Sequence, residues 1–198
     1  MTAPRTAIVE RATSETRITA ELRLDAAGTA NVSTGLGFFD HMLTALAKHA
    51  RFDLTLTCAG DLHIDDHHTI EDCALALGAA LDQALGDRAG IERFAHAYAP
   101  LDESLVRVVI DFSGRPFAHC ELDFSRDAIG PVATENLTHF FRSLASAARC
   151  TLHLDLIRGD NDHHKAEAAF KALAIALRTA TRTVPGDAGI PSTKGTLT

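Results

Sequence analysis

The stretch Asp66-His67-His68-Thr69-Ile70-Glu71 is repeated as Asp162-His163-His164-Lys165-Ala166-Glu167, 96 residues further along the chain. Both copies read Asp-His-His-x-x-Glu, and each is preceded by a matching histidine, His41 and His139, which stand 98 residues apart. Self-similarity of this kind decides how the rest of a sequence is interpreted. Two copies in a chain of 198 residues indicate an internal duplication rather than a solenoid.

The repeat extends beyond these motifs. Residues 41–47 are similar to residues 139–145, and Leu54-Thr55-Leu56 matches Leu152-His153-Leu154. The offset then falls from 98 to 96, as a short deletion in a loop would produce. We therefore predict a single domain over residues 1–198, made of one half at about 8–95, a second half at about 96–183 and a C-terminal tail at 184–198.

Hydrophobic periodicity supports the same division. Apolar and polar residues alternate in the expected strands, and apolar residues recur at helical spacing in the expected helices. The predicted strands cover residues 8–24, 30–33, 52–58, 105–110, 117–124 and 150–157, and the predicted helices 38–49, 67–85, 135–148 and 164–181. Strands and helices alternate within each half, which predicts mixed sheets covered by helices, an α+β fold.

Composition excludes several classes of protein. A net charge of −7 argues against a basic face for nucleic acid. Four scattered cysteines without a Cys-x-x-Cys pair are typical of reduced thiols in a cytoplasmic protein. The first ten residues contain no apolar run of signal-peptide length, and no stretch approaches the 18 apolar residues of a membrane span. We therefore expect neither nucleic acid nor a membrane as a partner.

The spacing within each motif is typical of metal ligands. Residues four apart share one face of a helix, so His67 and Glu71 can bind one ion, as can His163 and Glu167. Neighbouring residues differ by about 100° around a helix, so His67 and His68 point to different places. Doubled histidines therefore favour two ions over one. Imidazole and carboxylate suit Mn, Fe, Co, Ni or Zn, and the lack of thiolates argues against a closed structural zinc site.

The remaining histidines carry no comparable pattern. His63, His96, His119 and His153 are interpreted as ordinary surface or core residues, because a lone histidine is seldom a ligand.

The chain resembles imidazoleglycerol-phosphate dehydratase of histidine biosynthesis in several blocks. Residues 35–43 (GLGFFDHML) and 60–72 (GDLHIDDHHTIED) are similar to the family's first two blocks. Residues 163–172 (HHKAEAAFKA) and the tail Pro191-Ser192-Thr193-Lys194-Gly195 match as well. The resemblance covers roughly residues 8–197, and no ligand position departs from it.

The resemblance implies a fold and a metal centre. The fold would be two α+β half-domains, each a four-stranded mixed sheet with two helices, with the helices packed between the two sheets. Two Mn²⁺ per subunit are expected, within a homo-oligomer of 24 subunits whose sites are shared between chains. One ion would be held by His41, His68, His163 and Glu167, and the other by His67, Glu71, His139 and His164.

It also implies an activity, that of a metal-dependent hydro-lyase. Water would be removed from D-erythro-imidazoleglycerol phosphate to give imidazole acetol phosphate. The hydrogen that is lost from carbon is not acidic in the substrate. Binding of the imidazole as imidazolate would therefore have to expel the neighbouring hydroxyl first, which makes the next C–H acidic. Glu15 is the expected acid/base, because both steps move a proton. The expected substrate contacts are Glu15, His49, Arg93, Arg115 and, from the tail, Ser192, Thr193 and Lys194.

Three further interpretations stay open at this point. Asp102 and Glu103 could orient metal ligands through hydrogen bonds. A non-catalytic metal-storage cage would need carboxylate-rich faces beyond the two motifs, which the sequence lacks. A di-metal phosphohydrolase would need more bridging aspartates than the motifs offer.

Overall fold

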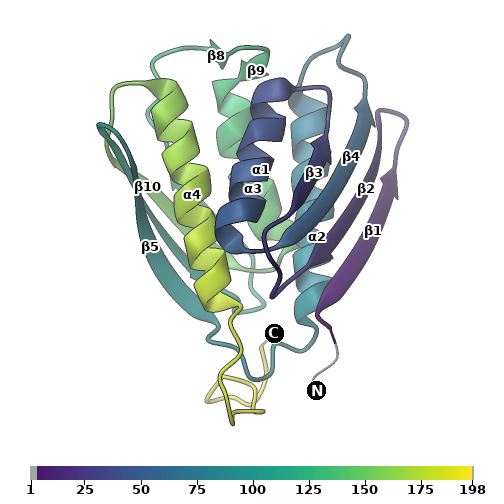
Figure 1. Ribbon diagram of the computed structural model, residues 1–198, viewed down its shortest axis with the longest axis vertical. Helices are drawn as coiled ribbons and strands as arrows, with labels where there is room; N and C mark the ends of the chain where they lie inside the picture. The colour runs from purple at the N-terminus through teal and green to yellow at the C-terminus, as the bar shows by residue number, and fades with distance from the viewer. Residues whose placement is uncertain (1–3, 198) are drawn as a thin grey trace.

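The computed structural model describes residues 4–197 and contains two sheets of identical topology (Figure 1). The first sheet has the strand order β1-β2-β4-β3 and the second β5-β6-β10-β7. In each sheet the last strand in that order pairs in parallel and the others pair antiparallel. The first half contains β1 (Thr6–Ala12), β2 (Thr16–Arg23), β3 (Ala30–Ser33), α1 (Gly37–Ala50), β4 (Asp53–Gly60) and α2 (His67–Leu85).

The second half repeats this order with one addition. A small hairpin, β8 and β9, precedes the third helix. The elements are β5 (Phe94–Leu101), β6 (Ser104–Asp111), β7 (Phe117–Glu121), β8 (Ala128–Ile129), β9 (Val132–Ala133), α3 (Thr134–Ala147), β10 (Thr151–Arg158) and α4 (Asp162–Ala180). The predicted α+β class with duplicated half-domains is confirmed.

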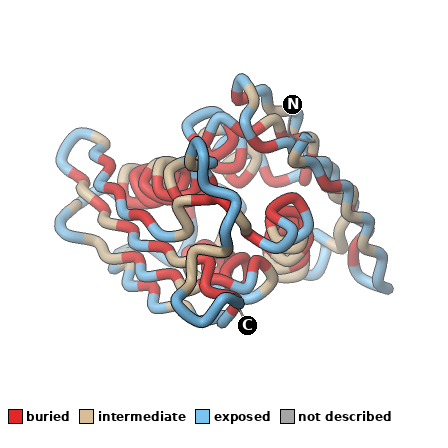
Figure 2. Tube along the Cα trace, turned by 90° about the horizontal axis from the view of Figure 1, so that it is seen from below, coloured by how far each residue is buried: buried red, intermediate tan, exposed pale blue. Residues whose placement is uncertain are grey.

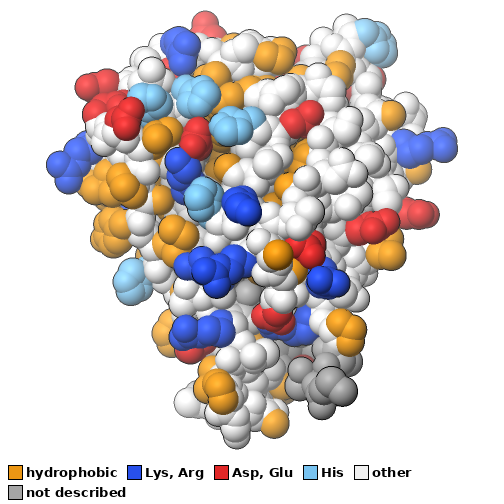
Figure 3. Space-filling view, in the orientation of Figure 1, with side chains coloured by type: hydrophobic (Ala, Val, Ile, Leu, Met, Phe, Trp, Pro, Cys, Tyr) orange, Lys and Arg blue, Asp and Glu red, His pale blue; other side chains and the backbone are white. Residues whose placement is uncertain are grey.

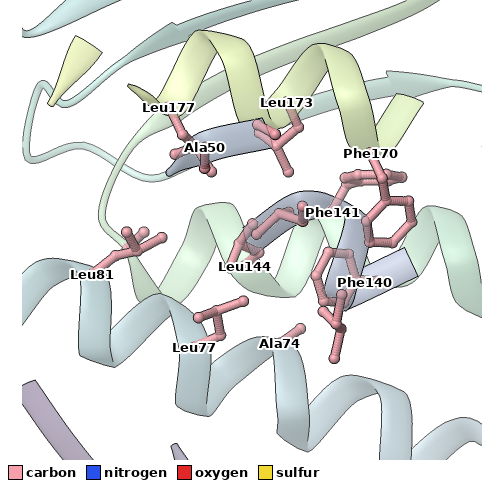
Figure 4. Packing of buried hydrophobic residues seen from close by; sticks show 14 of the residues in the cluster. Ala50, Ala74, Leu77, Leu81, Phe140, Phe141, Leu144, Phe170, Leu173 and Leu177 are labelled. Carbon is pink, nitrogen blue, oxygen red and sulfur yellow. The ribbon is translucent and has the colours of Figure 1, made fainter. Parts of the chain in front are cut away.

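The helices lie between the two sheets, and α2 packs on α3 while α1 packs on α4 (Figure 1). Each sheet is buried on the face that meets the helices, so residues alternate between buried and exposed along the strands (Figure 2). Phe140, Phe141 and Phe170 fill the centre of the helical layer, with Phe140 stacked on Phe170 at 5.0 Å between ring centroids (Figure 4). Burial of these large apolar side chains is the main force that joins the two halves.

Gly78 permits the close approach of α2 to α3. A Cβ at this position would lie 2.7 Å from the Ala147 Cβ and 2.7 Å from the Leu144 carbonyl oxygen. Two helices can approach this closely only where one of them lacks a side chain, which offsets the low helix propensity of glycine.

The structure differs from the predicted strands, most clearly at the β1–β2 hairpin and at β5. Residues 8–24, predicted as one strand, form the hairpin of β1 and β2. Its turn is made by Thr13, whose hydroxyl accepts hydrogen bonds from the amides of Glu15 and Thr16, so no glycine or proline marks it. β5 escaped prediction because its inward residues are three alanines, which have weak strand preference, and it spans the expected boundary near residue 95.

Among the described residues, no helix is both long enough and apolar enough to cross a membrane.

Candidate metal centre

All eight predicted ligands lie in the first two turns of a helix, and all four helices begin at the same end of the molecule (Figure 1). Histidine side chains gather there on the face formed by α1 and α4 (Figure 3). Helix N-termini carry a partial positive charge, which favours ionised carboxylates beside them. The duplicated fold therefore brings together residues that stand nearly 100 positions apart in the sequence.

The first cluster joins α1 to α4. His41 Nε2 lies 3.2 Å from Glu167 Oε2, and His163 Nε2 lies 3.4 Å from the same oxygen. One ligand atom from each of the three residues lies within 4.8 Å of the others. A single ion with bonds of about 2.0–2.2 Å can be reached by all three after small side-chain rotations.

The second cluster joins α2 to α3 in the same way. His67 Nε2 lies 3.6 Å from Glu71 Oε2, and His139 Nε2 lies 3.1 Å from Glu71 Oε1. The rings of His67 and His139 stack with their centroids 4.9 Å apart. Each cluster thus takes a histidine and a glutamate four apart on a long helix, together with one histidine from a short helix of the other half.

His68 and His164 join neither cluster within the chain. His68 Nδ1 lies 3.0 Å from Asp61 Oδ2, and its Nε2 lies 3.6 Å from Glu15 Oε1. His164 Nδ1 lies 2.7 Å from Glu103 Oε2. One chain therefore assembles three of the four ligands expected for each ion and directs the fourth histidine elsewhere.

Three of the predicted ligands have a hydrogen-bond partner at Nδ1, which leaves Nε2 for an ion. Asp61 and Glu103 accept from His68 and His164, and these hydrogen bonds raise the pKa of each imidazole. The pKa of Glu103 is lowered far below its usual range, chiefly by His164. Asn136 Oδ1 lies 3.0 Å from His67 Nδ1, and its amide donates to Asp66, so its oxygen must be the acceptor. Such partners orient metal-binding histidines.

Sequence reasoning found Glu103 but missed Asp61 and Asn136. Asp61 directly follows Gly60 at the end of β4, and Asn136 lies outside both motifs. The aspartates that open the motifs do not face the clusters, since Asp66 accepts from the Ala133 amide and Asp162 from the Ser125 amide. They anchor the starts of the long helices.

Glu167 remains ionised although it is mostly buried. Burial raises the pKa of this carboxyl, but hydrogen bonds from Lys171 and His41 prevail and lower the pKa to about 2. Lys171 Nζ lies 2.6 Å from Glu167 Oε1. His49 lies further along α1, where partial burial and Lys171 lower its pKa. A carboxylate that stays charged in a sheltered position is a suitable metal ligand.

The predicted substrate contacts Arg93, Arg115 and the tail residues lie at the opposite end of the molecule from both clusters. The Arg93 amide donates to the Ala180 carbonyl, the last residue of α4, while the clusters adjoin the start of that helix. Nineteen residues at 1.5 Å each place these ends about 28 Å apart. The Arg93 side chain binds Asp111 and donates to the Pro191 carbonyl at 2.8 Å.

Arg115 and the tail lie at the same far end. Arg115 follows β6, and the hydroxyl of Thr151, the first residue of β10, donates to its carbonyl at 3.4 Å. In the tail, the amide of Lys194 donates to the Ser192 hydroxyl, and Thr193 and Lys194 are exposed.

The fold and the two clusters define a duplicated α+β protein with two candidate metal sites per chain. A family model described as imidazoleglycerol-phosphate dehydratase matches residues 34–177. The chain belongs to the imidazoleglycerol-phosphate dehydratase family.

Individual relatives agree with this assignment. The imidazoleglycerol-phosphate dehydratase of Salinibacter ruber is 55% identical over 194 residues, which cover 98% of this chain and 96% of that protein. The protein of the same name from Phytophthora nicotianae is 58% identical over 193 residues, and this chain spans 42% of that relative's length. The crystal structure of the Staphylococcus aureus imidazoleglycerol-phosphate dehydratase has a TM-score of 0.82 at 35% identity, covering 90% of this chain and 99% of that one.

Proposed function

We propose that this protein is a cytoplasmic hydro-lyase that converts D-erythro-imidazoleglycerol phosphate into imidazole acetol phosphate in histidine biosynthesis, with two Mn²⁺ per subunit. The observation that carries the proposal is the pair of matched clusters, each with two imidazoles and one carboxylate in reach of one point. Membership of the dehydratase family supplies the reaction, and the four free cysteines agree with a reducing compartment.

The donor atoms fit manganese or a similar divalent ion. Imidazole and carboxylate ligands without thiolate suit Mn²⁺, and partners at Nδ1 present Nε2 to the ion. His41, His163 and Glu167 would hold one ion, and His67, Glu71 and His139 the other. When bound, the pair would supply the Lewis acidity that holds the substrate's imidazole as imidazolate.

The fourth ligands and the phosphate contacts are proposed to come from other subunits. A substrate on the order of 10 Å long cannot reach from the clusters to Arg93 in one chain, since α4 separates them by about 28 Å. His68 and His164 point away from the clusters of their own chain, as ligands for a neighbour's ion would. This supports a homo-oligomer with shared sites, and we propose the 24-subunit assembly expected for the family.

Glu15 is proposed as the acid/base. The Glu15 carboxylate lies 3.6 Å from His68 Nε2. If His68 binds an ion, Glu15 therefore lies close to that ion and to the imidazole of the bound substrate. One substrate carbon loses its hydroxyl group, and Glu15 can take the proton from the carbon beside it. Glu15 can then return a proton when the resulting enol becomes the ketone.

Two groups at the far end are proposed to hold the phosphate. Arg93 donates a hydrogen bond to the Pro191 carbonyl and so positions the next three residues, Ser192, Thr193 and Lys194. Their hydroxyl and ammonium groups can bind phosphate oxygens. Arg115 adds a guanidinium, and His49 is a further contact near Lys171.

Elemental analysis combined with an assay on imidazoleglycerol phosphate tests the proposal. We expect at least two transition-metal ions per chain, formation of imidazole acetol phosphate, and loss of activity after chelation. Metal without turnover would favour a storage cage, and release of inorganic phosphate would favour a phosphohydrolase. Active protein with one ion or none would contradict the two-metal proposal.

A further inference from the structure

Four side chains with atoms that can serve as metal ligands form a square on the outer face of the second sheet, away from the helices. β7 and β10 pair in parallel, with His119 opposite His153 and Glu121 opposite Asp155. Residues two apart on a strand share one face, so all four side chains point outward. None of them belongs to the candidate centre, and sequence reasoning gave no role to either histidine.

The distances within this square suit coordination of one ion. His119 Nε2 lies 3.2 Å from Glu121 Oε1, and one ligand atom each from His119, Glu121 and Asp155 lies within 4.8 Å of the others. Two ligands bound to one ion at about 2.0–2.2 Å stand roughly 3–3.5 Å apart. The separation of His119 and Glu121 already falls in that range.

His153 lies directly across from His119 on the neighbouring strand, beside the three grouped residues. Its ring centroid lies 6.0 Å from that of His119, compared with 6.1 Å between His41 and His163 in the first cluster of the candidate centre. Phe117 packs against the His153 ring at 5.6 Å and limits its rotation. β10 is an interior strand, so the backbone beneath His153 and Asp155 is held on both sides.

The net charge of the square is negative and favours a bound cation. Two ionised carboxylates contribute two negative charges, and Arg107 on β6 neutralises part of this by donating to Asp155 Oδ2 at 3.1 Å. The other oxygen of Asp155 remains for a ligand bond. Two imidazoles and two carboxylates without thiolate favour a divalent ion such as Zn²⁺ over Mg²⁺, which prefers oxygen alone.

We propose that His119, His153, Glu121 and Asp155 form an additional divalent-metal site on the outer sheet face, independent of the dehydration site. The site would take Zn²⁺ or a similar borderline ion. It lies on the face of the sheet opposite to the helices that carry the candidate centre.

The test counts Zn²⁺ bound to the full-length assembled protein at equilibrium dialysis, for the wild type, His119→Ala and His153→Ala. His96→Ala is the matched control, because His96 lies on the same outer face but is separated from the square by the β6 strand and Val109. All three histidines are exposed, so their loss leaves the core intact.

We expect His119→Ala and His153→Ala each to bind one Zn²⁺ per chain fewer than the wild type, whereas His96→Ala binds as many. The difference does not depend on how many ions the helical clusters hold, so failure of the proposed function would leave it readable. Equal counts for the wild type and His119→Ala would overturn the proposal. A loss of the same size in His96→Ala would overturn it too, by showing nonspecific binding.

Discussion

The proton on a histidine ring decides which nitrogen can bind a metal. At His68, a carboxylate 3.0 Å from Nδ1 favours a proton there and leaves the Nε2 lone pair free. Asp61 makes this contact without belonging to either repeated motif. We expect Asp61 to position His68 as a ligand, so its removal should affect metal binding before it affects stability.

Asp61→Ala should lower the affinity for metal by roughly 10- to 100-fold, the usual effect of losing such a partner. Competition with a coloured chelator measures the affinity directly. His63→Ala is the control, since His63 lies exposed in the same loop. Unchanged affinity in Asp61→Ala would mean that His68 is not a ligand or does not need orientation.

Glu15→Gln keeps the shape of the side chain and removes its basicity. If Glu15 moves the proton, turnover should fall by roughly 10²- to 10⁴-fold while metal content stays constant. Glu10→Gln, an exposed glutamate on β1, should leave turnover unchanged. Near-normal turnover in Glu15→Gln would assign proton transfer to another residue.

At the scale of the elements, the contact between α2 and α3 depends on Gly78. Gly78→Ala should reduce the free energy of unfolding by about 1–3 kcal/mol, because the new methyl group meets backbone atoms of α3 that cannot move cheaply. Gly37→Ala is the control, since nothing lies within 4 Å of a Cβ there. Thermal unfolding at equal protein concentration compares the two, and equal melting temperatures would show that the helices can separate slightly at no cost.

The long helices were predictable from sequence, whereas the turn between β1 and β2 and the strand β5 were not. α2 begins at His67 and ends at Leu85, as predicted, because a long apolar stripe and Gly86 mark it. The turn between β1 and β2 depends on a threonine hydroxyl, and β5 depends on alanines that favour a strand only because they pack against α4. Local patterns cannot reveal such dependence on tertiary contacts.

The candidate site shows the same limit. Residue type and helical spacing identify the pairs His67 with Glu71 and His163 with Glu167, since these are local. Asn136 as the partner of His67 could not be inferred, because it is brought in by packing of α3 on α2. The assignments of individual ligands and substrate contacts stay predictions.

For the whole molecule, the proposed sharing of ligands links metal binding to assembly. An ion that binds only the assembled form stabilises it by mass action, so chelation should weaken the oligomer. Light scattering over a dilution series, with and without chelator, would show dissociation at a higher protein concentration after metal removal. A monomer that is fully active with its metals would contradict shared sites.

The distance along α4 has a consequence for mixtures of damaged chains. Suppose that the metal cluster and the phosphate contacts of one site belong to different copies of the chain. His41→Ala then lacks an intact cluster and Arg93→Ala lacks an intact phosphate contact, so each variant alone is inactive. Co-assembly from equal amounts of the two variants should then restore roughly a quarter of wild-type activity. In a symmetric oligomer the cluster of a given site is intact in about half of the cases, and so, independently, are its phosphate contacts. The two inactive variants would thus complement each other. Chains that each contain a complete site could not do this.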